Sequence, residues 1–391
     1  MVNLGAYFVV GIVATVVTAG MTPVVRAIAR QRQWLAMPNE RTVHSVPTPN
    51  IGGVAMFIGV VVSLVVAWQM DQFSFVFDDN SEPLGVLIAA TLILIVGTWD
   101  DLKNLSAPAR VVGIIATALV MVYFGITMFY FRVPFLDVFQ LGNDWIPMFT
   151  VLWLLVMTQA VNLIDGLDGL AAGIVAIASS SFFIYSFYLS NEGKLVEPNI
   201  GPLIAVITVG VCVGFLPFNF NRASIFMGDG GSYLLGLLMA ISTTVVGGRT
   251  DPSQAASSQT YFFLAPLFIP LIILGVPIFD VVYAILRRVR KRQGFATADK
   301  GHLHHRLINL GHGPRRAVAI LWLWTTLLSG FVLYPVFYPS ASTLAPFGLI
   351  ALVLFLYTVL HPDLKRPAPT ADQPDPVSVS TNSTVPDAQD S

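Results

Sequence analysis

Three polar side chains near the middle of the chain, Asn162, Asp165 and Asp168, are spaced three residues apart. Their segment, residues 162–169, lies between two long apolar runs, where polar groups are unfavourable unless they bind something. Residues three apart share a face of a helical turn, so we expect the three side chains to face one ligand. Glycines such as Gly166 leave room for that ligand near the backbone. The alternative is a tight polar turn, because Asp-Gly is a common turn pair.

A pair of adjacent carboxylates, Asp100 and Asp101, ends another apolar run. Adjacent carboxylates repel each other, and a bound cation would relieve that repulsion. They are also unfavourably placed against the negative end of a helix dipole. These costs favour a functional site over a solvated helix end. Arg110 follows nine residues after Asp101 and is placed to face a phosphate group.

A third segment, residues 226–232, runs from Phe226 directly into an apolar run. Its Gly-Gly-Ser sequence predicts a helix start whose free N–H groups form a phosphate site. Asp229 lies just before them and could hold a divalent ion, since Mg²⁺ is usually bound by one or two carboxylates together with substrate phosphate oxygens. The alternative for Asp229 is a simple helix N-cap.

The fourth segment carries three histidines and an arginine: His302, His304, His305 and Arg306. Three histidines could form a transition-metal site, but the basic neighbours favour recognition of an anion. Arginine in particular binds phosphate in a bidentate manner. A further stretch rich in Pro and Gly, residues 41–53, predicts a shaped loop that is either a connector or a ligand contact.

The composition places these segments in a membrane protein. Hydrophobic residues make up 55% of the 391 residues and charged residues only 11%, far below the roughly 25% of soluble domains. Eleven apolar runs are long enough to span a bilayer, so we predict an all-α polytopic membrane protein. They lie near residues 6–29, 51–70, 84–99, 109–129, 146–161, 170–190, 200–218, 231–247, 262–286, 317–338 and 344–360. We expect residues 1–361 to form one membrane domain and residues 362–391, rich in Pro, Asp, Ser and Thr, to be a disordered tail.

Lysine and arginine are distributed unevenly between the connecting loops. Numbering the loops in order, the odd loops and the tail hold 18 of the 21 basic residues. The positive-inside rule therefore places those loops in the cytoplasm and the N-terminus outside. All four segments fall on the cytoplasmic side. Carboxylates for a hard cation, cationic groups for phosphate and a helix N-terminus on one face suggest phosphoryl transfer near the lipid boundary.

Together the four segments resemble the polyprenyl-phosphate N-acetylhexosamine-1-phosphate transferases, in particular the bacterial branch that makes undecaprenyl- or decaprenyl-diphospho-GlcNAc. The resemblance covers about residues 41–310. It rests on the order and spacing of Asp100-Asp101, residues 162–169, Phe226-Met227-Gly228-Asp229 and His302-Leu303-His304-His305.

The resemblance implies a Mg²⁺-dependent reaction, with Mn²⁺ as the alternative metal. A phosphate oxygen of the lipid attacks the β-phosphorus of a UDP-sugar and UMP leaves, the first membrane step of cell-wall or surface glycan synthesis. By position, the metal ligands would be Asn162 and Asp229. The catalytic residues would be Asp100, Asp101, Asp165, His302, His304 and His305. The substrate-binding residues would be Arg110, Gly166, Asp168, Phe226 and Arg306, with Asp168 and Phe226 on uracil.

The chain lacks the Pro-Ile-His-His-His-Phe-Glu run of the branch that uses UDP-MurNAc-pentapeptide. The resemblance therefore implies UDP-GlcNAc as donor, with another UDP-N-acetylhexosamine or UDP-MurNAc-pentapeptide as alternatives. The other partners implied are an undecaprenyl or decaprenyl phosphate, the bilayer of a bacterial plasma membrane and a possible homodimer, but no nucleic acid. The different classes that remain open are an ion-coupled transporter and a scaffold. The transporter would need its acids at the membrane midplane, whereas these cluster at one mouth.

Overall fold

The computed structural model describes residues 3–37, 46–78, 80–132, 138–193, 195, 197–247, 313–337 and 345–360. In these ranges the chain is almost entirely helical, which confirms the all-α class. The helices are α1 (Leu4–Gln31), α2 (Gly53–Trp68), α3 (Ser74–Phe77), α4 (Glu82–Lys103), α5 (Ala107–Tyr123), α6 (Trp145–Ile164), α7 (Leu170–Asn191), α8 (Gly201–Asn219), α9 (Gly228–Gly247), α14 (Pro314–Phe337) and α15 (Ala345–Leu360), with a short 3-10 helix η1 (Asp71–Phe73). Two antiparallel pairs of short strands complete the fold: β1 (Leu35–Ala36) with β2 (Thr48–Pro49), and β3 (Tyr130–Arg132) with β4 (Val138–Gln140).

The helices agree with the apolar runs of the sequence. Seven of the helices within the described ranges are long and apolar enough to cross a membrane, and α2 joined to η1 and α3 across a 94° bend would be an eighth. The two remaining runs, α5 and α15, form shorter apolar helices. The predicted run at 262–286 and the predicted tail at 362–391 lie outside the described residues. The protein is therefore a multi-pass membrane protein, as predicted.

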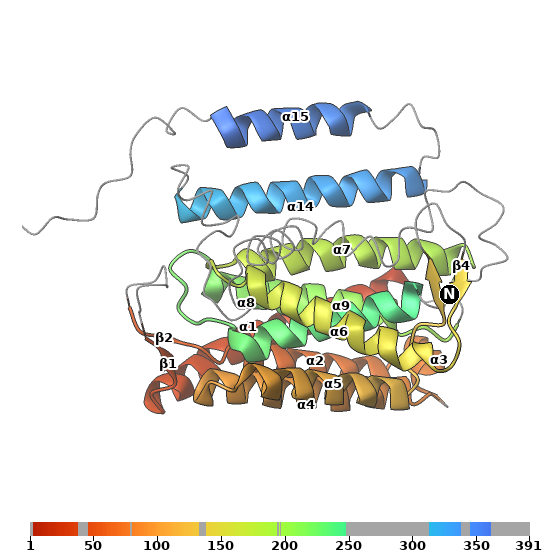
Figure 1. The fold of residues 1–391 in the computed structure, drawn as a ribbon, viewed down its shortest axis with the longest axis horizontal. Helices are drawn as coiled ribbons and strands as arrows, with labels where there is room; N and C mark the ends of the chain where they lie inside the picture. The colour runs from red at the N-terminus through yellow and green to blue at the C-terminus, as the bar shows by residue number, and fades with distance from the viewer. Residues whose placement is uncertain are drawn as a thin grey trace, which may run out of the picture.

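Helix α9 lies at the centre of the bundle, and nearly every one of its residues is buried. It packs against α4, α6, α8 and α2, while α14 packs on α7 and α15 on α14 (Figure 1). Small residues permit this close packing between membrane helices. A Cβ added at Gly236 of α9 would lie 2.6 Å from the Cα of Thr158 in α6. The residues at the start of α9 therefore lie on the most completely buried of the described membrane-spanning helices.

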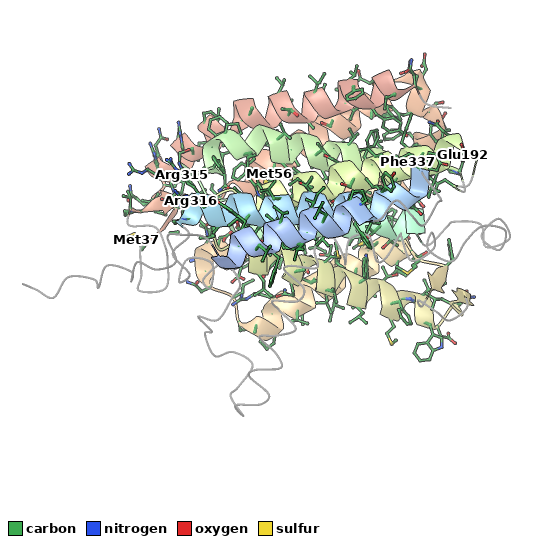
Figure 2. The ribbon with its side chains drawn as sticks, turned by 90° about the horizontal axis from the view of Figure 1, so that it is seen from above. Met37, Met56, Glu192, Arg315, Arg316 and Phe337 are labelled. Atoms are coloured by element: carbon green, nitrogen blue, oxygen red, sulfur yellow. The ribbon has the colours of Figure 1, made fainter. Side chains whose placement is uncertain are left out.

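The two ends of the bundle differ in charge. We call the end that holds the β1–β2 pair and the start of α9 the motif end, and the end that holds β3 and β4 the opposite end (Figure 1). Met37, Arg315 and Arg316 lie at the motif end, and Glu192 and Phe337 at the opposite one (Figure 2). Of the lysines and arginines in the described ranges, only Arg132 lies at the opposite end. The motif end carries Arg26, Arg30, Arg32, Lys103, Arg110, Arg222, Arg315 and Arg316.

Candidate active site

The amide of Asn162 joins the end of α6 to the start of α9. Its Nδ2 donates to Oδ1 of Asp229 at 2.6 Å and lies 3.3 Å from Oγ of Ser232. Asn162 is in the last turn of α6, and Asp229 is in the first turn of α9. The two residues assigned to the metal from the sequence are thus side by side, although 67 positions separate them in the chain.

Asp101 of α4 caps the N-terminus of α9 from a different helix. Its Oδ1 accepts the backbone N–H of Asp229 at 2.9 Å, and its Oδ2 accepts that of Gly230 at 3.1 Å. The first N–H groups of a helix have no partner within the helix, so they need an acceptor. The N–H of Gly231 is bonded to the carbonyl of Met227. The prediction of free N–H groups for phosphate at this helix start is therefore wrong, because Asp101 and Met227 already occupy them.

Asp100, the neighbouring carboxylate, faces α5. Its buried Oδ2 lies 3.0 Å from Nε of Arg110, and its Oδ1 accepts the N–H of Leu105 at 2.8 Å. Arg110 also donates to the carbonyl of Leu105, so one ion pair closes the turn between α4 and α5. Asp100 also interacts electrostatically with Asp229. It therefore stands between a cationic side chain and the carboxylate at the start of α9.

Asp165 and Asp168, which the sequence placed on one helical face, lie in a turn after α6. Helix α6 ends at Ile164, and residues 165–169 form turns before α7 begins. Asp168 turns toward the loop after α8, where its Oδ2 accepts the N–H of Ala223 at 2.8 Å. The expected shared face is therefore wrong, because the helix stops before Asp165. Gly166 is exposed in this turn.

Asp165 instead completes an acidic group around Asp229. Loss of hydration on burial raises the pKa of Asp165 to about 7, and the negative charges of Asp229 and Asp168 add to this effect. Asp229 thus interacts through like charges with Asp165 on one side and with Asp100 on the other. Such a group is unfavourable without a counter-charge, and a divalent cation would relieve it.

The loop that leads into α9 is hydrogen-bonded through its backbone to the segment before α2. The N–H of Phe226 donates to the carbonyl of Pro49 at 2.8 Å, and the N–H of Gly52 donates to the carbonyl of Phe226 at 2.9 Å. On its other side, buried Asn219 accepts the N–H of Gly169 and donates to the carbonyl of Ile225. Hydrogen bonds therefore hold the loop on two sides: the segment before α2 binds Phe226, and Asn219 binds the neighbouring Ile225.

Comparison with known proteins decides the family. The profile described as Glycosyl transferase family 4 matches residues 83–247. The decaprenyl-phosphate N-acetylglucosaminephosphotransferase of Mycolicibacterium smegmatis is 34% identical over 370 residues, which are 93% of this chain and 90% of the relative. This chain belongs to the polyprenyl-phosphate N-acetylglucosaminephosphotransferase family.

Two further relatives agree with this assignment. The probable undecaprenyl-phosphate N-acetylglucosaminyl 1-phosphate transferase of Bacillus subtilis is 34% identical over 83% of this chain and 82% of the relative. The phospho-N-acetylmuramoyl-pentapeptide-transferase of Staphylococcus carnosus is 25% identical over 83% of this chain and 97% of the relative. The resemblance seen in the sequence is confirmed, and the protein is a phosphoglycosyl transferase.

Two site residues of the transferase were not identified from the sequence. Asn50 donates to Asp101, and Asn219 links the turn at Gly169 to the loop at Ile225. Asn219 was detectable in principle as an amide at the end of an apolar run, but its partners lie in a separate turn and loop. The histidine motif, His302, His304 and His305 with Arg306, lies outside the described residues.

Asp165 gives the transferase a predicted pH-dependent stability. An unfolded Asp loses its proton near pH 4, whereas Asp165 in the fold does so at about 7. The folded state therefore binds more protons between these values, and stability falls as the pH rises from about 4 to about 7. In detergent with EDTA, we expect a lower Tm at about pH 7.5 than at about pH 5.

The variant Asp165→Asn removes this titrating group. Its Tm at about pH 7.5 should rise above that of the wild type, and the difference between the two pH values should shrink. Asp144→Asn, in an exposed residue at the opposite end, is the matched control and should keep the wild-type difference. An Asp165→Asn protein with the full wild-type pH dependence would show that Asp165 is not the group responsible.

Proposed function

We propose that this transferase moves GlcNAc-1-phosphate from UDP-GlcNAc to a polyprenyl phosphate, undecaprenyl or decaprenyl. A phosphate oxygen of the lipid forms a bond to the β-phosphorus of the donor. The bond from that phosphorus to the bridging oxygen breaks, and UMP leaves with the electron pair. The observation that carries the proposal is that Asp229 bonds to Asn162 and interacts with Asp100, which is itself paired with Arg110. Higher identity to GlcNAc-phosphate transferases, 34% against 25% for the muramoyl-pentapeptide enzyme, supports the sugar.

The pair of Asp229 and Asn162 fits Mg²⁺, or Mn²⁺, as a cofactor. Mg²⁺ needs only one or two carboxylates when substrate phosphates supply further oxygens. Asp229 would hold the ion, with Asn162 beside it, and Asp100 and Asp165 would add negative charge nearby. When bound, the ion would neutralise the charge that develops on the diphosphate.

The other side chains divide between the two substrates. Phe226 lies in the loop between α8 and α9, and Asp168 bonds to Ala223 of the same loop; we assign both to uracil. Asp100 and Arg110 lie where α4 meets α5, and we assign them to the arriving lipid phosphate. A phosphate monoester is largely ionised at pH 7, so this site has to position the nucleophile more than deprotonate it. We assign His302, His304, His305 and Arg306 to the donor diphosphate and sugar, and Gly166 to substrate binding.

The charge distribution supports a cytoplasmic motif end in a bacterial plasma membrane. In the described part of the chain, the basic residues gather at the motif end, as the positive-inside rule requires of a cytoplasmic face. UDP-GlcNAc and a lipid phosphate at the cytoplasmic surface can both reach a site at that end. A homodimer would be compatible with this arrangement.

Cysteine labelling in intact cells tests this orientation. Replacing buried Cys212 by alanine provides a cysteine-free background. In it, Ser106→Cys, exposed at the motif end, should be protected from an impermeant external reagent, and Asn143→Cys, exposed at the opposite end, should be labelled. The reverse pattern would contradict the proposed orientation, and permeabilised cells would show that both cysteines can react.

The activity itself is tested with radiolabelled donors. Membranes with the protein should incorporate label from UDP-[¹⁴C]GlcNAc into organic-extractable lipid when polyprenyl phosphate is supplied, and membranes without it should not. UDP-GalNAc and UDP-MurNAc-pentapeptide, each labelled in the sugar, serve as competing donors. Preferential transfer from either one would replace GlcNAc as the sugar. Absence of transfer from all three would overturn the proposed reaction.

A further inference from the structure

Asp101 receives three hydrogen bonds from two separate segments. Besides the N–H groups of Asp229 and Gly230, its Oδ1 accepts Nδ2 of Asn50 at 2.8 Å. Asn50 follows strand β2 and lies 51 positions before Asp101. A carboxylate offers about four lone-pair positions, so three donors leave it little capacity for a substrate group. The geometry of Asp101 is therefore that of a support for α9.

The segment around Asn50 also holds the residues that precede α9. Pro49 accepts from Phe226, Gly52 donates to Phe226, and Gly53 donates to the carbonyl of Met227. The backbone of Asn50 packs equally closely, because a Cβ added at Gly228 would lie 2.5 Å from its carbonyl oxygen. Backbone bonds thus fix Phe226, while the Asn50 side chain reaches past them to Asp101.

The start of α9 is closely packed against its neighbours, so its position depends on the few side chains that bond to it, Asp101 among them. A Cβ added at Gly97 of α4 would lie 2.6 Å from the carbonyl oxygen of Asp229, and one at Gly53 of α2 would lie 2.6 Å from the carbonyl carbon of Gly230. The start of α9 is therefore enclosed between the end of α4 and the start of α2. Between these helices, one hydrogen bond joins Asn50 to Asp101 and a second joins Asp101 to the backbone N–H of Asp229. We call this pair of hydrogen bonds the tie.

We propose that Asn50 is a positioning residue for phosphoryl transfer, and that it acts through Asp101 to set the carboxylate of Asp229 against Asn162. This inference rests on the proposed function, because it places Asp229 at the reacting centre. It assigns to the segment after β2 a role different from a connector or a ligand contact. Asn50 itself bonds to Asp101 and orients Asp229, the residue that would hold the metal ion.

The expected signature is a loss of kcat without a matching loss of nucleotide affinity. Groups that orient the residues of a metal site typically matter by 10- to 100-fold, so we expect Asn50→Ala to lower kcat by roughly that factor. UMP affinity, measured by calorimetry, should stay within about twofold, because the backbone bonds of Phe226 do not use the Asn50 side chain. Asn50→Asp should lose at least as much activity as Asn50→Ala, since it places a carboxylate against Asp101.

Asn199 offers a matched control, because it bonds to the opposite end of α9. Its Nδ2 donates to the carbonyl of Val245 at 2.8 Å, so Asn199→Asp removes an asparagine bond made directly to α9, whereas Asn50→Asp removes one that reaches α9 through Asp101. If these asparagines only stabilise the fold, both Asp variants should lower Tm and leave kcat similar. The inference requires that kcat falls in Asn50→Asp and stays near the wild-type value in Asn199→Asp. Equal kcat values in the two variants would overturn it.

A double variant tests whether Asn50 acts through Asp101. Coupled residues give non-additive effects, so removing the Asn50 side chain should matter little once Asp101 is altered. Asn50→Ala combined with Asp101→Asn should therefore lose hardly more activity than Asp101→Asn alone. Losses that multiply in the double variant would contradict the inference.

Hydrogen exchange provides a readout that does not depend on turnover. Peptides covering residues 224–234 should exchange faster in Asn50→Asp than in the wild type, because the N–H groups of Asp229 and Gly230 lose a well-placed acceptor. Asn199→Asp should leave these peptides unchanged. If the wild type transfers no GlcNAc-1-phosphate, the proposed function fails, and faster exchange would still demonstrate the tie. Unchanged exchange in Asn50→Asp overturns the tie whether or not the enzyme is active.

Discussion

Asp229→Asn should abolish turnover across a wide range of Mg²⁺ concentrations while leaving the fold intact. A hard cation prefers charged oxygen ligands, and Asp229 is the acid at the centre of the site. We expect kcat to fall by about 10³-fold or more, or about 4 kcal/mol of activation free energy. The substitution is isosteric, and the amide oxygen that it introduces can still accept from Asn162.

The stability of this variant should move in the opposite direction from its activity. Asp229 repels the carboxylates of Asp100 and Asp165, so removing its charge should keep or raise Tm in EDTA. Turnover over Mg²⁺ concentrations from micromolar to tens of millimolar, beside thermal unfolding of the same preparation, makes the test. Asp144→Asn is the control for a charge change far from the site. Near-normal turnover at millimolar Mg²⁺ would reduce Asp229 to a structural residue of the helix start.

The membrane architecture could be predicted from the sequence because it depends on local properties. A bilayer requires long apolar segments with internally bonded backbone, so hydropathy alone located runs such as 170–190 and 231–247. The helices α7 and α9 lie at those positions. The acids at Asp100 and Asp229 were equally visible, since charge at the end of an apolar run is rare unless it has a use.

The division of labour among the acids could not be predicted, because it depends on long-range partners. Asp101 caps α9 by accepting the N–H of Asp229, which lies 128 positions later, and nothing local distinguishes it from Asp100. The shared face expected for Asp165 and Asp168 was wrong because α6 ends at Ile164, and helix ends are the least certain part of a sequence-based prediction. The sequence indicated the loop at residues 41–53 but did not single out Asn50, because an asparagine in a loop of Pro and Gly is ordinary turn chemistry.

The proposed separation of nucleotide and lipid-phosphate sites predicts opposite behaviour for two Asp variants. Asp168→Ala should weaken UDP-GlcNAc and UMP alike. It removes the acceptor for the N–H of Ala223, which lies in the loop that carries Phe226, together with any bond to uracil. The loss of one hydrogen bond is worth about 0.5–1.5 kcal/mol, or roughly 2- to 12-fold in Kd. Asp168→Asn is the matched control, because it keeps one acceptor oxygen for Ala223 and should show the smaller effect if loop bracing dominates.

Asp100→Asn should behave differently because its partner belongs to the lipid-phosphate side. The variant loses the ion pair with Arg110 but keeps an acceptor for the N–H of Leu105, so the turn between α4 and α5 should remain closed. We expect kcat to fall by roughly 100-fold or more, while UDP-GlcNAc affinity changes by less than about threefold. A group that acts only when the lipid phosphate attacks phosphorus affects the transition state and leaves the binding of the donor nearly unchanged.

Calorimetric titration of both variants with UDP-GlcNAc and UMP, beside their turnover rates, makes this comparison decisive. Asp100 interacts with Asp229 as well as with Arg110, so the alternative is a single site in which both acids serve the donor diphosphate. In that case Asp100→Asn would change UDP-GlcNAc affinity strongly and UMP affinity little, since UMP lacks the β-phosphate. A loss of UDP-GlcNAc affinity in Asp100→Asn as large as that in Asp168→Ala would therefore show that the two substrates do not have separate acidic sites.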